Sequence, residues 1–66
     1  MLNEIQRQRA VEYLKSTDKA VSITELSLKA RVNYYSISDE DLDYFKENGF
    51  EIVKEGKRVR IQNEKN

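Results

Sequence analysis

The sequence predicts a small, mostly α-helical domain with a C-terminal β-hairpin, and three observations indicate this fold. Three stretches combine a Ser or Asn capping residue with apolar residues at helical spacing. Residues 50–61 instead alternate between apolar and polar side chains, as a half-buried hairpin does. The chain has 66 residues, of which 38% are hydrophobic, enough for one small core but not for two. We therefore expect one domain over residues 1–62, followed by a frayed tail over residues 63–66.

The first predicted helix ends near Ser16. Asn3 can cap it, with Gln6 three residues later as in a capping box. At 100° per residue, one broad face collects five apolar or aromatic side chains: Ile5, Ala10, Val11, Tyr13 and Leu14. Cations fall elsewhere on the helix, so we expect a solvated face carrying Arg7, Arg9 and Lys15.

The second predicted helix runs from about Ile23 to Arg31. Ser22 followed by Glu25 has the spacing of a capping box, in which Ser22 accepts from the amide of Glu25. Val21 and Leu26 occupy the two positions of a hydrophobic staple. A helix this short must be held by packing rather than by intrinsic propensity.

The third predicted helix runs from about Asp39 to Asn48. Ser38 and Asp41 again have capping-box spacing, and Gly49 can adopt the left-handed conformation that ends a helix. A helix continuing back to Tyr34 would place an unpaired Asp41 on the apolar face, which is costly. We therefore expect the helix to start after Ser38, with residues 33–37 forming a turn or a short 3₁₀ segment.

The predicted hairpin places Phe50, Ile52, Val59 and Ile61 on one face. A turn centred on Glu55-Gly56 would pair Ile52 with Val59 and Phe50 with Ile61. It would also pair Glu51 with Arg60, neutralising that cation. A four-residue loop over residues 54–57 is the alternative.

Composition excludes several classes of function. The chain has no histidine and no cysteine, which removes the usual general base, thiolate chemistry and the common zinc ligands. Asp39, Asp41 and Asp43 lack the glycine and terminal glutamate of a calcium-binding EF-hand. We expect neither an enzyme nor a metal or other cofactor. No apolar run approaches the roughly 20 residues of a membrane span, and no secretory signal is evident, so a cytoplasmic protein without membrane contact is expected.

Charge is segregated along the chain although its net value is zero. Residues 1–32 carry +2, residues 33–51 carry −5 and residues 52–66 carry +3. A local basic face is therefore compatible with the neutral total.

The region from Ser22 to Ile61 resembles a winged helix-turn-helix domain, such as the DNA-binding domain of biotin-operon repressors. The capped second helix carries the Glu25-Leu26 pair, and Val32 is the aliphatic residue of the turn. Gly49-Phe50 ends the third helix, and Lys54 to Arg60 form the Gly-containing wing. The resemblance implies a three-helix winged helix-turn-helix fold. The family often has glycine where this chain has Arg31, so Arg31 would be strained if its backbone is left-handed.

The resemblance also implies double-stranded DNA as the partner. The small size of the chain suits a transcriptional regulator or architectural factor of phage or plasmid type. The third helix would normally approach base edges, but here it begins with three carboxylates, which repel phosphates. We therefore expect contact through the wing and through the turn before the third helix, with phosphate contacts from the end of the second. A small module binds weakly, so a homodimer or cooperative array is expected. The predicted DNA-binding residues are Lys29, Arg31, Asn33, Tyr34, Tyr35, Ser36, Lys54, Lys57 and Arg58.

Two alternatives remain open from the sequence. Two adjacent tyrosines cannot both point inward from one turn, so one is free to stack on a base, or both are partly buried core residues. The acidic third helix could instead bind a basic protein partner or mimic DNA. The residues for that alternative are Asp39, Glu40, Asp41 and Asp43.

Overall fold

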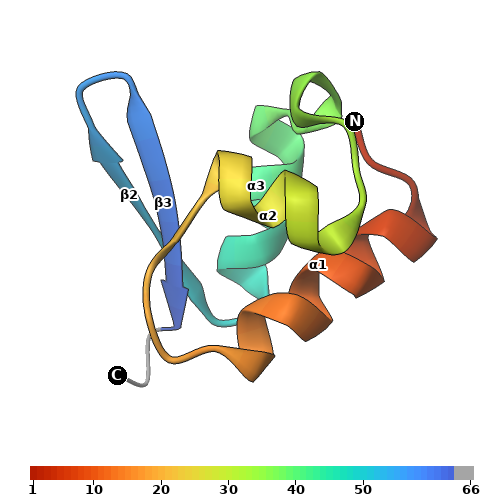
Figure 1. Cartoon of the computed structure of the whole chain (residues 1–66), viewed down its shortest axis with the longest axis horizontal. Coiled ribbons are helices and arrows are strands. Elements are labelled where there is room, and N and C mark those ends of the chain that lie inside the picture. Colours follow the sequence, from red (N-terminus) through yellow and green to blue (C-terminus); the bar gives the residue numbers. More distant parts are fainter. Residues whose placement is uncertain (64–66) are drawn as a thin grey trace.

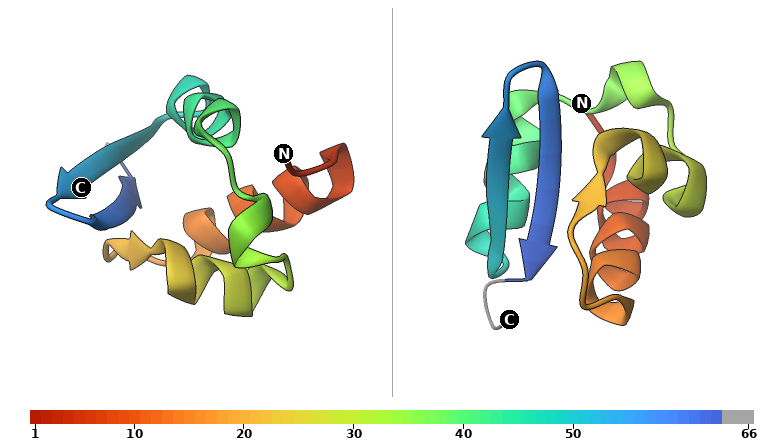
Figure 2. Two further views of the ribbon diagram at one scale, coloured as in Figure 1. Left: turned by 90° about the horizontal axis from the view of Figure 1, so that it is seen from above. Right: turned by 60° about the vertical axis from the view of Figure 1, so that its left-hand side comes forward.

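The computed structural model describes residues 1–63, and it has three helices followed by a C-terminal antiparallel β-hairpin, as the sequence predicts. Its arrangement is compatible with a winged helix. The hairpin stands beside the three helices, and its turn lies at the same end of the molecule as a short 3₁₀ segment (Figures 1 and 2). The elements in chain order are α1 (Glu4–Ser16), β1 (Val21–Ser22), α2 (Ile23–Ala30), η1 (Tyr34–Ser36), α3 (Asp39–Glu47), β2 (Phe50–Glu55) and β3 (Arg58–Asn63).

Side-chain caps begin all three α-helices at the predicted residues. Asn3 and Ser38 each form a complete capping box, with Gln6 and Asp41 respectively. Ser22 accepts from the amide of Glu25 as expected. The Glu25 side chain does not reciprocate, because its carboxylate accepts the hydroxyl proton of Tyr13 on α1 instead. This bond raises the pKa of Tyr13 and ties the start of α2 to α1.

The sheet has three strands in the order β1-β3-β2, so the last strand in sequence is the central one. The sequence analysis missed β1, which has only two residues and pairs Val21 with Ile61 and Ser22 with Arg60. Figure 2 shows β1 beside β3, on the side away from β2. The described part of β3 includes Asn63, one residue beyond the expected end of the domain, and the rest of the expected tail lies outside the described residues.

The predicted hairpin register is wrong by two residues. Ile52 pairs with Ile61 rather than with Val59, and Lys54 pairs with Val59. The loop consists of Gly56 and Lys57 alone, and Gly56 has φ +61°. Glycine at the first of two loop positions is the pattern of a type II′ turn, whose twist matches that of the flanking strands. A shift of two keeps the four predicted residues on one face. Phe50 and Ile61 lie in the core and Ile52 packs against it, whereas Val59 is half-buried outside the core.

The core lies between the helices and the sheet, where α3 packs on β2 and α1 on β3. Ile5, predicted to face the core, is 67% exposed, and Leu2 is buried in the core instead. The described core residues are Leu2, Ala10, Val11, Leu14, Val21, Leu26, Ala30, Val32, Phe45, Phe50 and Ile61.

Asp41 is fully buried even though α3 begins where predicted. The helix break at Ser38 does not keep this carboxylate in solvent. It accepts hydrogen bonds from the amides of Leu2 (3.0 Å) and Ser38 (2.9 Å) and from Arg7 Nε (2.9 Å). Arg7 also lies over the Tyr44 ring, 4.8 Å from its centroid. The expectation that Arg7 lies on a solvated face is therefore wrong, because it joins α1 to α3.

Arg31 caps the C-terminus of α2 in the left-handed conformation, with φ 57° and ψ 49°. The strain expected from the missing glycine is therefore present. Within residues 1–63, no helix has both the length and the apolar character needed to cross a membrane.

Candidate nucleic-acid interface

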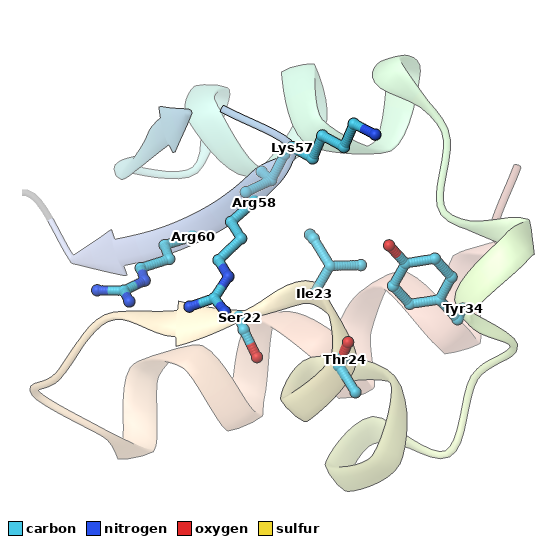
Figure 3. Close-up of a pocket in the computed structure, with 8 residues that line it drawn as sticks. Ser22, Ile23, Thr24, Tyr34, Lys57, Arg58 and Arg60 are labelled. Carbon is cyan, nitrogen blue, oxygen red and sulfur yellow. The ribbon is translucent and has the colours of Figure 1, made fainter. Parts of the chain in front are cut away.

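A groove of about 370 Å³ lies between three parts of the chain: the end of β3 next to the hairpin turn, the start of α2, and η1 (Figure 3). It combines basic, hydroxyl-bearing, aromatic and apolar side chains, and no carboxylate of the described residues 1–63 lines it. The lining residues are Ser22, Ile23, Thr24, Tyr34, Lys57, Arg58, Val59 and Arg60.

The unequal lengths of β1 and β3 explain why a groove forms here. β1 covers β3 only at Ile61 and Arg60, whereas β3 continues for two more residues, back to Arg58. After Ser22 the chain turns into α2 instead of following β3 farther. The wing therefore extends past the covering strand, and the start of α2 faces it from across the groove (Figure 3).

Three cations from the wing line one side of the groove. Lys57, Arg58 and Arg60 are exposed, and within residues 1–63 none of them forms an ion pair. The expected neutralisation of Arg60 is wrong, because Glu51 lies opposite Gln62 and accepts a hydrogen bond from its side-chain amide (3.0 Å). Arg60 pairs in register with Val53 instead. Glu55 lies opposite Arg58 in register without an ion pair among residues 1–63, so three cations face one nearby carboxylate. The net positive potential attracts anions.

Lys54, predicted to act with Lys57 and Arg58, does not line the groove. It lies on β2, which is separated from β1 and α2 by the central strand β3. Its side chain is exposed, so it remains available for contacts on the other side of the wing.

Two hydroxyls lie at the start of α2. Ser22 Oγ accepts from the amide of Glu25 (3.1 Å), which leaves its own proton free to donate. Thr24 is exposed in the first turn of the same helix. Phosphate oxygens are acceptors for groups of this kind and for arginine side chains.

The two tyrosines of the turn before α3 lie in different environments. Tyr34 lines the groove and is 47% exposed, whereas Tyr35 is 91% exposed and lies outside it. The alternative that both rings are partly buried core residues is wrong, because both tyrosines are exposed and neither belongs to the described core or packs against it. The two rings contact edge to face, with centroids 5.3 Å apart. Asn33 serves the local fold by accepting from the amide of Tyr35 (2.9 Å), and Ser36 is half-buried.

The remaining predicted cations, Lys29 and Arg31, lie at the other end of α2 from the groove. Both are exposed, and the Arg31 carbonyl accepts from Arg9 (3.4 Å). The structure therefore does not bring them together with the wing.

The residues of the acidic alternative do not form one surface. Asp39, Glu40 and Asp43 are exposed on α3, but Asp41 is buried and cannot meet a partner. Burial alone would raise the pKa of Asp41. The amide hydrogen bonds from Ser38 and Leu2, together with Arg7, outweigh burial and hold the pKa below its ordinary value.

Sequence reasoning missed Ser22, Thr24 and Arg60 as groove residues. The capping pattern places Ser22 and Thr24 only at the start of a helix, and the predicted register pairs Arg60 with Glu51. Recognising Val21-Ser22 as a strand opposite Arg60 would have placed all three near one another.

Compared with protein-family models, curated proteins and solved structures, the chain shows no match. Among residues 1–63, no cluster of three or more acidic side chains could hold a metal ion.

Proposed function

We propose that this protein is a small winged-helix DNA-binding protein that contacts duplex DNA through the groove beside its wing. The observation that carries the proposal is a set of three cations, Lys57, Arg58 and Arg60, along one side of a groove. Among residues 1–63, these cations form no ion pair and no carboxylate lines the groove. Nucleic-acid binding depends chiefly on such contacts to phosphates, which supply affinity without sequence information.

The groove supports backbone contact rather than base reading by α3. Arginine side chains can bind a phosphate through two parallel hydrogen bonds, and the hydroxyls of Ser22 and Thr24 can add single ones. The start of α2 adds the positive end of a helix dipole. The wing then supplies the attraction that the acidic start of α3 cannot supply.

The same proposal implies a biological setting. A regulator or architectural factor of phage or plasmid type would act in the cytoplasm, where such DNA lies. One module of this size makes few contacts, so useful affinity would come from a homodimer or a cooperative array on the duplex.

Removal of the three groove cations tests the proposal. Lys57→Ala, Arg58→Ala and Arg60→Ala combined should weaken binding to any duplex. It should flatten the slope of log affinity against log salt by at most about 2.7, because each lost phosphate contact contributes roughly 0.9. The measurement is a salt titration by fluorescence anisotropy on one labelled blunt duplex.

A double variant, Lys29→Ala with Lys54→Ala, is the matched control, since it removes exposed cations that do not line the groove. It should change the slope less. Thermal melts should stay close to wild type for both proteins, because exposed charges contribute little to stability. An unchanged slope in the folded triple variant would reject the groove as the DNA contact.

A second candidate function is binding of a basic protein partner by α3. The observation in its favour is that Asp39, Glu40 and Asp43 are exposed and form no ion pair within residues 1–63. Asp41 is no part of this surface because it is buried.

A further inference from the structure

We propose that the groove accepts one unpaired nucleotide, with its base against Tyr34 and its phosphate on Arg58 and Arg60. The preferred ligand would then be duplex DNA that ends in an unpaired strand rather than a blunt duplex. This inference rests on the proposed function and specifies the DNA that the same groove takes.

The groove has chemically different ends. Figure 3 shows Arg58 extending to Ser22 and Arg60 pointing outward past the same end of the groove, while Tyr34 lies across from the wing with its hydroxyl pointing into the groove. Ile23 lies between these ends in Figure 3, and Val59 is the other apolar residue of the lining. A nucleotide has the matching asymmetry, because it carries an anionic phosphate at one end and a flat aromatic base at the other.

The size of the groove agrees with a ligand of this kind. Its volume of about 370 Å³ falls in the range of roughly 300–1,000 Å³ that is typical of small-molecule sites. Because the groove is open to solvent, the strand on either side of the bound nucleotide could continue past it.

Tyr34 distinguishes an unpaired nucleotide from a paired one. About half of this residue is exposed at the groove, and within residues 1–63 its hydroxyl forms no hydrogen bond. A base inside a duplex has both faces covered by neighbouring bases, so it cannot present a face to a side chain. Unpaired bases stack on aromatic side chains in this way, with little regard to sequence. Duplex contact therefore explains the cations but gives Tyr34 no partner.

The test compares three labelled DNA hairpins that share one duplex stem. The first is blunt, the second carries a four-thymine overhang, and the third carries an overhang of four abasic sites with the same phosphates. Since phosphate contacts are matched, the wild-type protein should bind the thymine overhang about fivefold or more tightly than the abasic one.

Variants assign this preference to the groove. Tyr34→Ala should abolish the difference between thymine and abasic overhangs, whereas Tyr34→Phe should retain it because the ring remains. Tyr35→Ala is the matched control, since its ring is adjacent but lies outside the groove. Circular dichroism melts check that each variant is folded. If Tyr34→Ala does not fold, Tyr34→Phe keeps the test informative.

Two results would overturn the inference. Equal affinity of the wild-type protein for the thymine and abasic overhangs would reject base stacking, and salt-dependent binding to the blunt hairpin would leave the proposed function standing. Loss of the preference in Tyr35→Ala but not in Tyr34→Ala would place the base outside the groove. Failure of the wild-type protein to bind any of the three hairpins would instead reject the proposed function itself.

Discussion

At the residue scale, Arg31 carries the clearest backbone strain. It is the one non-glycine residue with positive φ within residues 1–63, and its exposed side chain has no ion pair there. The left-handed conformation costs an L-residue roughly 1–2 kcal/mol, whereas glycine adopts it freely.

Arg31→Gly should therefore raise the free energy of unfolding by about 0.5–1 kcal/mol, since the relief of strain exceeds the entropy that glycine adds to the unfolded chain. Arg31→Ala is the control, because alanine keeps the strain and should leave stability nearly unchanged. Urea denaturation measures both. Equal shifts in the two variants would show that the Arg31 side chain matters rather than its backbone.

Local chemistry made some of the groove residues predictable. Lys57 and Arg58 were recognised because cations near a hairpin turn stay exposed whichever register forms. Arg60 was not, since its partner depends on the register, and hydrophobic alternation cannot distinguish two registers that differ by two residues. The backbone strain at Arg31 was expected from the resemblance to winged helices, in which glycine is common at that position.

At the element scale, caps fixed where the helices begin. Ser22 and Ser38 lie three residues before the groups that they cap, so the sequence carries the whole signal. The hairpin turn was harder, because Gly56 fits either position of a two-residue loop until its backbone conformation is known. The two-residue strand β1 lacked a period long enough to detect.

The charge at the start of α3 separates the two candidate functions. Asp39→Asn combined with Glu40→Gln should raise the affinity for non-specific duplex DNA if α3 lies near phosphates, because repulsion is removed. If α3 instead binds a basic protein, DNA affinity should not change. Anisotropy on a blunt duplex measures the effect, with a melt to follow the loss of about 0.3–1 kcal/mol expected from the helix dipole. Raised affinity would exclude protein binding as the only role of α3.

At the scale of the whole molecule, Asp41 connects segments that are distant in sequence. Its carboxylate joins Leu2, before α1, and Arg7, within α1, to the start of α3. The spacing of apolar residues cannot predict a contact between residues 34 positions apart. The sequence therefore predicted the cap at Ser38 but not the ion pair between Arg7 and Asp41. Removing one charge of a buried ion pair is costly, because the other charge is then left without a partner.

Asp41→Asn should therefore destabilise the fold by about 3 kcal/mol at neutral pH. Because the pKa of Asp41 is lowered on folding, its stabilisation is complete above the ordinary value of 3.8. The stabilisation is lost as pH falls below that value and through the pKa of the folded state. Wild-type stability should then approach that of Asp41→Asn in urea denaturation below about pH 4, and a constant gap down to pH 2 would contradict this prediction.

The strand order has a consequence for synthesis on the ribosome. β3 is the central strand but the last to be made, and both β1 and β2 pair only with it. The helices can begin to pack as they emerge, whereas the sheet has to wait until residue 63 has left the exit tunnel. Until then, the two outer strands remain unpaired edges of the kind that invites association between chains. A nascent chain stalled at the wing turn would therefore be the form most prone to aggregate.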